Sequence, residues 1–180
     1  MPTHAPPLFL RGAALGAVAL AAALTAAGAE AGALRYRGTN ADGGVSSGAL
    51  VRRQGANGGS LVRGRALTTD GQGQGTVASA ARVMGPHGGT GARSGSTHVN
   101  ADGSASHQSS LSAVNANGSV QSSGSATRDA AGHVSQGRST TATSNVTGNS
   151  VQSSTAYSSA TGLSHSATCY NAAGAVIACR

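Results

Sequence analysis

Polar and apolar side chains alternate along several segments of this chain. The stretch "SVQSSGSAT" (residues 119–127) would place alternate residues on opposite faces of a strand, with only polar residues on the second face. One face would carry Val120, Ser122, Gly124 and Ala126. The stretch "NSVQSSTAYSS" (residues 149–159) alternates in the same way. A period of two residues indicates β-strands rather than helices.

The same short motif returns at a fixed interval. In "VNADGSASHQSSLSAVNANGSVQSSG" the group NADG is followed fifteen residues later by NANG. Asp and Asn bond to the backbone two residues on, and glycine adopts positive φ at little cost, so each motif predicts a tight turn. The series places turn glycines at Gly43, Gly58, Gly73, Gly88, Gly103 and Gly118, and then, with small shifts of spacing, at Gly132, Gly148, Gly162 and Gly174.

These turns predict a mostly β fold of antiparallel strands built from about ten repeats of ~15 residues, with partial disorder. If each unit is one strand, the chain is a meander. If a second break divides each unit, the units are stacked hairpins. That break would use Gly48, Gly64, Gly95, Gly124 and Gly137. A β-solenoid with one coil per repeat is the remaining alternative.

Helix is disfavoured beyond the N-terminal region, because glycine is frequent and Ser and Thr compete for backbone hydrogen bonds. One short helix is expected in "TVASAARVM" (Thr76 to Met84), which is rich in Ala.

The N-terminus resembles a secretory signal peptide over residues 1–31. A polar opening with Arg11 precedes the apolar run "GAALGAVALAAAL", which would form a signal helix, and A-x-A patterns favour cleavage after Ala29 or Ala31. An uncleaved anchor is the alternative, but the run is Ala-rich and short of the ~20 strongly apolar residues that a span needs. We therefore expect an exported protein of the periplasm, outer surface or extracellular medium, with no stable membrane span after cleavage.

Two cysteines, Cys169 and Cys179, lie near the C-terminus. An exported chain enters an oxidising compartment, so this even pair predicts a disulfide. The two residues would close a small loop at the end of the chain.

Composition limits the size of any hydrophobic core. Leu, Val, Ile and Phe account for 19 of the 149 residues after Ala31. Such a chain is either disordered or folds with little hydrophobic core. Its net charge of +7 is modest, so repulsion between its own charges does not require it to be disordered.

Charge divides the chain into an Arg-rich half, residues 32–93, and a Ser/Thr-rich half, residues 94–180, which ends in the Cys loop. The first half contains eight Arg against Asp42 and Asp70. Its basic residues predict a binding site for a polyanion such as lipopolysaccharide, acidic polysaccharide or nucleic acid. The candidate residues are Arg35, Arg37, Arg52, Arg53, Arg63 and Arg65. A set of charges that keeps strand edges soluble is the alternative interpretation.

No motif for chemistry is found. The histidines do not share a phase of the repeat, so we predict no metal site. There is no G-x-S-x-G nucleophile elbow, no P-loop and no close pair of carboxylates, so we predict no catalytic residue, no cofactor and no small-molecule substrate.

Two segments carry a family resemblance. "RDAAGHVSQGRS" and "YNAAGAVIACR" resemble the YD repeats of bacterial RHS-type shell proteins, which are β-hairpins built on a Tyr-Asp-x-x-Gly turn. The resemblance implies hairpins and an extracellular shell or adhesive role. As a whole, the chain resembles exported Gly/Ser-rich repeat proteins of Gram-negative bacteria.

These observations favour an exported, non-enzymatic β-repeat protein with a structural or adhesive role at the cell surface or in the extracellular matrix. It would present Ser/Thr rows to a polymer, a partner or copies of itself. The alternatives are a polyanion-binding module and a fibre-forming matrix protein, with a Thr-based ice binder as a more remote one.

Overall fold

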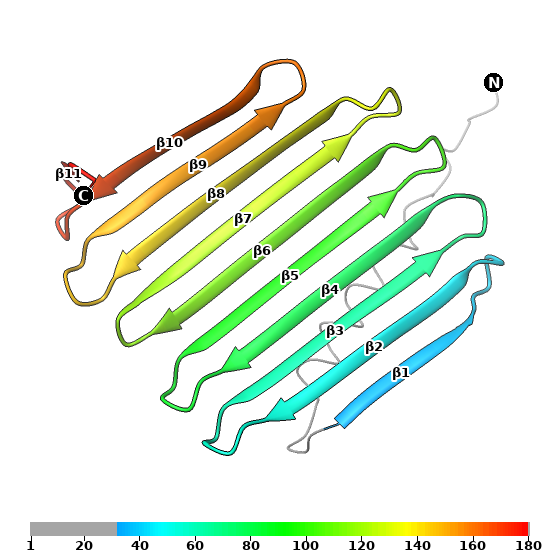
Figure 1. Cartoon of the computed structure of the whole chain (residues 1–180), viewed down its shortest axis with the longest axis horizontal. Coiled ribbons are helices and arrows are strands. Elements are labelled where there is room, and N and C mark those ends of the chain that lie inside the picture. Colours follow the sequence, from blue (N-terminus) through cyan, green and yellow to red (C-terminus); the bar gives the residue numbers. More distant parts are fainter. Residues whose placement is uncertain (1–31, 180) are drawn as a thin grey trace, which may run out of the picture.

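The computed structural model describes residues 32–179, which form one antiparallel sheet (Figure 1). Eleven strands follow one another in the order β1 to β11, so every strand pairs with its neighbours in sequence. The predicted signal peptide, residues 1–31, lies outside the described residues.

The strands of the sheet are eight to eleven residues long, apart from the last one. They are β1 (Gly32–Thr39), β2 (Val45–Gln54), β3 (Ser60–Thr69), β4 (Gly75–Met84), β5 (Thr90–Val99), β6 (Ala105–Asn115), β7 (Gly118–Arg128), β8 (Val134–Ser144), β9 (Ser150–Ser158), β10 (Gly162–Tyr170) and β11 (Val176–Ile177).

Each repeat forms one strand, so the predicted all-β fold of antiparallel strands is confirmed and takes the form of a meander. The alternatives of hairpins within a unit and of a solenoid are wrong. The five glycines considered as mid-unit breaks lie inside strands, as Gly64 does in β3 and Gly95 in β5.

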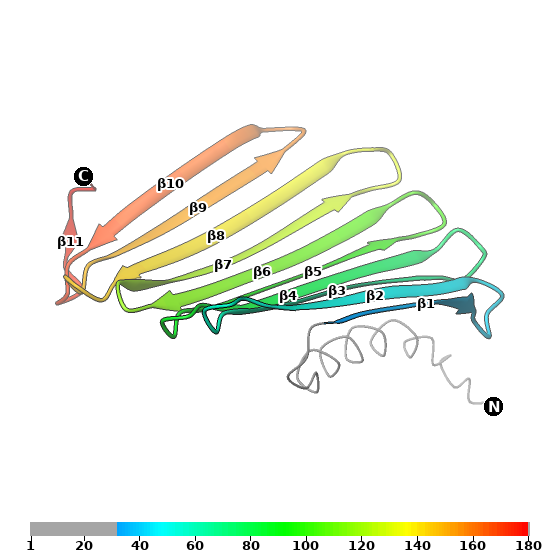
Figure 2. The same ribbon diagram turned by 60° about the horizontal axis from the view of Figure 1, so that its bottom comes forward.

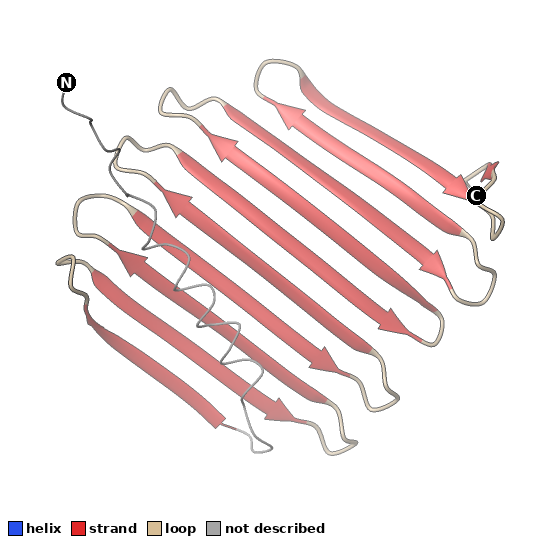
Figure 3. Cartoon of the chain, turned by 180° about the vertical axis from the view of Figure 1, so that it is seen from behind, coloured by secondary structure: helices blue, strands red, loops and turns tan. Residues whose placement is uncertain are grey.

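The helix expected at Thr76–Met84 is also wrong, because this segment belongs to β4. Along its whole length, β4 pairs with β3 at one edge and with β5 at the other. These two ladders satisfy the backbone groups that a helix would have satisfied within the segment, and they override the helix propensity of the Ala residues. Figure 3 shows strands and loops alone over the described residues.

Most of the turns share a three-residue loop with the same hydrogen bonds. Between β5 and β6, the Asn100 amide donates to the Ser104 carbonyl oxygen at 2.9 Å, and the Gly103 amide donates to that of Asn100 at 3.0 Å. Gly103 has a φ of 81°. This is a β-turn followed by a left-handed glycine, the usual form of a three-residue hairpin loop.

The turn glycines predicted from the repeat have this left-handed conformation at nine of ten positions. The exception is Gly118, which is the first residue of β7 and pairs with Asn115 across a two-residue loop. That shorter loop accounts for the first shift in the spacing of the repeat.

The sheet is a single twisted layer with both faces exposed (Figure 2). Among the described residues, the buried set is limited to Gly44, Gly64, Ala78 and Ser122, with no large side chain fully buried. The alternation predicted in β7 is present, since Val120, Ser122, Gly124 and Ala126 are more buried than Gln121 and Ser123. The ladder and the turns, rather than a core, therefore define this architecture.

We predict that Gly103→Ala lowers the free energy of unfolding by about 1–2 kcal/mol, because its positive φ disfavours a side chain. A Cβ at this position meets nothing within 4 Å, so crowding adds nothing to this cost. Urea unfolding followed by circular dichroism measures the change.

Gly137→Ala is the matched control, because a Cβ there also meets nothing within 4 Å and the residue lies inside β8. This variant should be as stable as the wild type or more stable by up to ~1 kcal/mol. Equal losses for the two variants would contradict the role given to the left-handed turn.

Candidate functional site

The pairing of the strands sorts the arginines by face. Residues directly opposite each other in an antiparallel ladder share a face, and neighbours along a strand lie on opposite faces. Following the register from β1 to β10 places eight arginines on one side, which we call the arginine face. They are Arg35, Arg37, Arg53, Arg63, Arg65, Arg93, Arg128 and Arg138.

Within this face, small residues separate the charges. Ala49 of β2 pairs with Arg35 on one side and Arg65 on the other. Ala81 of β4 pairs in the same way with Arg63 and Arg93. Arginines in one row are therefore two strands apart, about 10 Å, and neighbours along a strand are ~7 Å apart. This spacing avoids directly opposed like charges and leaves an open array of guanidinium groups.

No carboxylate lies in any strand of the described sheet. The four Asp residues in this part of the chain all lie in turns: Asp42, Asp70, Asp102 and Asp129. Those turns join β1 to β2, β3 to β4, β5 to β6 and β7 to β8, so they occupy the same end of the sheet, at the upper right of Figure 1. The arginine face therefore has no acidic residue of its own to neutralise it.

The Asp residues in these turns bind backbone amides. Asp70 Oδ1 accepts hydrogen bonds from the amides of Gln72 and Gln74, at 2.8 and 2.9 Å, and the first of these is the main reason why its pKa is lowered. The pKa of Asp102 is lowered mainly by its side-chain hydrogen bond with Ser104. These carboxylates stabilise the turns by accepting hydrogen bonds from residues of the same turn.

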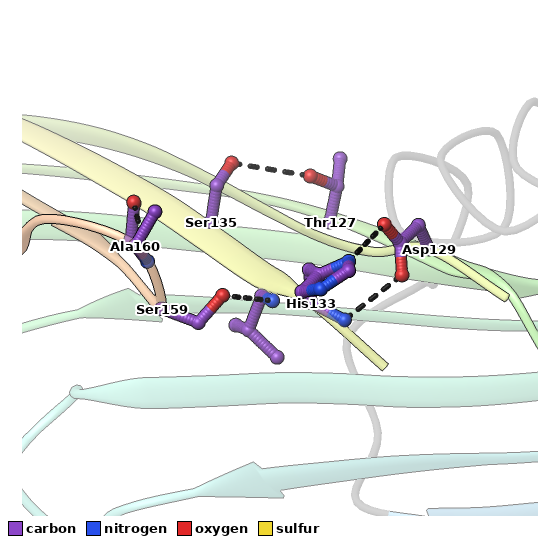
Figure 4. Close-up of polar contacts among 8 residues, drawn as sticks. Thr127, Asp129, His133, Ser135, Ser159 and Ala160 are labelled. Atoms are coloured by element: carbon purple, nitrogen blue, oxygen red, sulfur yellow. Dashed lines mark hydrogen bonds and ion pairs between the residues drawn. The ribbon is translucent and has the colours of Figure 1, made fainter. Parts of the chain in front are cut away.

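Asp129 holds the turn between β7 and β8 through His133. Its Oδ2 lies 2.8 Å from His133 Nδ1, and its Oδ1 accepts from the His133 amide at 2.8 Å (Figure 4). The hydrogen bond to the His133 side chain is the main cause of the lowered pKa of Asp129. Both side chains are exposed, so this pair fixes the turn rather than forming a buried site.

The sequence grouped six arginines as candidates, and the sheet places five of them together. Arg52 lies on the opposite face, because it directly precedes Arg53 in β2. Arg93 was missed as a candidate although it shares a row with Arg63. The alternation of the strands would have separated Arg52 from Arg53 in the sequence, since consecutive residues of a strand lie on opposite faces.

The arginine face also contains a row of apolar residues, near the end of the sheet opposite to the Asp-containing turns. The row crosses β4 to β9 through directly paired residues and continues to Cys169 and Ile177. It consists of Val83, Gly91, Ala113, Val120, Ala142 and Val151. These residues line an open groove of about 1070 Å³ that could accept an apolar group.

The disulfide between Cys169 and Cys179 closes the C-terminal end of this groove. The Cα atoms of the two cysteines are 5.4 Å apart, and the bond holds the segment after β11 against β10. In Figure 2, β11 turns up from the end of β10. A disulfide agrees with an exported protein, as the cysteine pair predicted.

The other side of the sheet, which we call the hydroxyl face, has a different chemistry. One row of directly paired residues crosses six strands, β5 to β10, with a serine in each. These serines are Ser94, Ser110, Ser123, Ser139, Ser154 and Ser166. The neighbouring row over β6 to β10 contains Ser112, Gln121, Thr141, Gln152 and Thr168.

Other candidate chemistry is sparse over the described range. His98, His107 and His165 each lie 2.8–2.9 Å from a Thr hydroxyl on the neighbouring strand. Residues 32–179 contain no group of three or more potential metal ligands. Within the same range, no helix is long and apolar enough to cross a membrane.

No protein-family model matches the chain, and neither a curated protein nor a solved structure shows significant similarity to it. The two segments that resemble YD repeats form the hairpins β7–β8 and β10–β11. The family resemblance itself stays a prediction.

The lowered pKa values of Asp70, Asp102 and Asp129 predict the effect of acid on stability. The unfolded chain, with ordinary carboxyl pKa values of about 3.8, binds these protons more readily than the folded chain. The contribution of these residues is therefore complete above that pH and is lost as the pH falls through the lowered values. Thermal melts of the wild type at pH 7 and pH 3 should show a lower midpoint at pH 3.

Replacing all three residues by Asn should reduce this loss, because an Asn side-chain oxygen accepts the same hydrogen bonds at either pH. Asn40 and Asn171 already do so in their own turns. A triple variant whose midpoint falls as far as that of the wild type would contradict this explanation.

Proposed function

We propose that this is an exported, non-enzymatic β-sheet protein of the cell surface or extracellular matrix, and that its arginine face binds an anionic polymer. The observation that carries the proposal is the segregation of eight arginines on a face whose strands contain no carboxylate. A surface of one sign attracts polymers of the opposite sign and concentrates them before contact.

The geometry favours an extended ligand over a small one. The main cluster lies on β1, β2, β3 and β5, where Arg35, Arg37, Arg53, Arg63, Arg65 and Arg93 are all exposed. Their spacing of roughly 7–10 Å suits the repeated charges of a polysaccharide or of lipopolysaccharide. The described part of the chain contains three Tyr and no Phe or Trp, so it offers few platforms for stacking bases, and nucleic acid is the less favoured polyanion.

The fold suits a structural role. A sheet without a core offers a broad surface for its length, and its loops are short turns held by their own hydrogen bonds. The disulfide and the A-x-A patterns of residues 27–33 support export.

The test is binding to heparin as the anionic probe. We expect retention on a heparin column that is lost as salt is raised, because exposed charge pairs are screened by ions. The double variant Arg63→Gln/Arg65→Gln should lower the affinity about tenfold, equivalent to ~1.4 kcal/mol.

The control is Arg52→Gln/Arg82→Gln, which removes the same charge from the hydroxyl face of β2 and β4. This variant should bind within about twofold of the wild type, with circular dichroism showing that both variants keep their sheet. Equal losses for the two variants would show that net charge, rather than the arginine face, determines binding. Retention that moderate salt does not change would overturn the proposed function.

A further inference from the structure

Residues 32–179 form one layer only, without the second layer that a stable domain normally has. Domains bury the apolar side of a sheet against another layer, and an open single sheet leaves that area in water. Here Leu34, Tyr36, Met84 and Val114 are 65%, 55%, 47% and 48% exposed. All four lie on the hydroxyl face, but only Val114 lies within β5 to β10. The arginine face exposes apolar side chains as well, such as Leu163 (71%) and Val83 (46%). Covering either face would remove apolar area from water, which is favourable, so charge has to decide between them.

Charge decides which face can meet a second copy of the chain. Two arginine faces would repel each other, since each carries eight positive charges and no negative ones over the described strands. The hydroxyl face carries Arg52 and Arg82, both on its first four strands. Over β5 to β10 it has no Arg, Lys, Asp or Glu. This part of the sheet is therefore uncharged and compatible with its own copy.

The side chains of this region suit close approach of two sheets. The central row is made of serines, and two pairs within it already bond to each other. Ser94 Oγ lies 2.8 Å from Ser110 Oγ, and Ser154 Oγ lies 2.8 Å from Ser166 Oγ. Hydroxyls with partners in their own row cost less to bury than unpaired ones. Small, regular side chains also allow sheets to interdigitate at a spacing of about 10 Å.

The available area is large enough for a stable dimer. Six strands at ~4.8 Å and about ten residues at ~3.3 Å give a face of roughly 950 Å² per copy. A standard interface buries about 800 Å² per partner.

We propose that two copies of the chain stack through the hydroxyl faces of β5 to β10, around a twofold axis, with both arginine faces outward. This arrangement supplies a second layer over β5 to β10 and separates the two charged surfaces. It does not depend on the proposed function, but it would give an anionic polymer two binding faces on one particle, so that the dimer could join two polymer chains.

The experiment uses adjacent residues of one strand that lie on opposite faces. Ser110 belongs to the serine row, whereas Ser109 lies on the arginine face, directly between Gly95 and Gly124 of the neighbouring strands. The wild type should be a dimer at ~10 µM in light scattering coupled to gel filtration. Ser110→Arg should lose the dimer, because twofold symmetry brings two new charges into the contact, whereas Ser109→Arg should keep it.

A second pair in β9 repeats the test, with Ser154→Arg on the hydroxyl face and Ser153→Arg on the arginine face. Circular dichroism reports the fold of every variant. The proposal is supported if only the two hydroxyl-face variants lose the dimer. These variants would then be either folded monomers or chains that have lost their β signal in circular dichroism. The proposal would be overturned if the wild type is a folded monomer, or if the arginine-face variants lose the dimer. It would also be overturned if the wild type forms a dimer or a fibre that none of the four substitutions disrupts. The last result would point to pairing through the sheet edges.

Discussion

The structure depends on the hydrogen bonds between successive strands, and on the turns that set their register. A hydrophobic core normally chooses the register of a sheet, since a slip by one residue moves every side chain to the other face. Here the buried set is too small to do so. Register is instead set locally, because every turn except the one before β7 contains a left-handed glycine, and most are closed by backbone hydrogen bonds such as those of Asn100 and Gly103. A glycine at this point costs little, whereas any other residue would be strained.

Within residues 32–179, neither face of the sheet has to pack into a hydrophobic core, so the side chains of the two faces can differ in their chemistry. Eight of the ten arginines in the described strands occupy one face, an uncharged region rich in serine and threonine covers the other face over β5 to β10, and the carboxylates lie in the turns at one end. The sheet also orders some of the arginines, since the guanidinium group of Arg138 donates to Ser122 Oγ at 3.0 Å. Binding of an anionic polymer and stacking of a second copy use opposite faces, so the two proposals are physically compatible.

The period of the turns was sufficient to predict the strands, because Asx and Gly residues act locally and need no information from distant parts of the chain. The helix expected at Thr76–Met84 failed for the opposite reason. Its Ala residues favour a helix, but the neighbouring turns place a strand on each side of it. The segment therefore forms backbone hydrogen bonds to β3 and β5 instead of within itself. The repeating unit of the structure is a pair of strands rather than a single one, because the turns at the two ends of the sheet differ. Turns at one end start with an Asx residue, at Asn40, Asp70, Asn100 and Asp129, whereas turns at the other end start with glycine at Gly55 and Gly85.

The arginine face could have been recognised from the sequence once the strands were fixed, since Arg63 and Arg65 are two residues apart whereas Arg52 and Arg53 are adjacent. The serine row could not have been. Its alignment depends on the length of each loop, and the loops before β7 and β9 depart from the three-residue form. Ser110 and Ser123 become neighbours only through the two-residue loop at Ala116 and Asn117.

Amide hydrogen exchange, resolved by residue, tests the central claim most directly. An antiparallel meander bonds the amides of an interior strand to one neighbour or the other, whereas an edge strand bonds only alternate amides. The account predicts slow exchange throughout β2 to β9 and an alternating pattern of slow and fast amides in β1. Fast exchange across the interior strands, or protection confined to one half of the sheet, would contradict it.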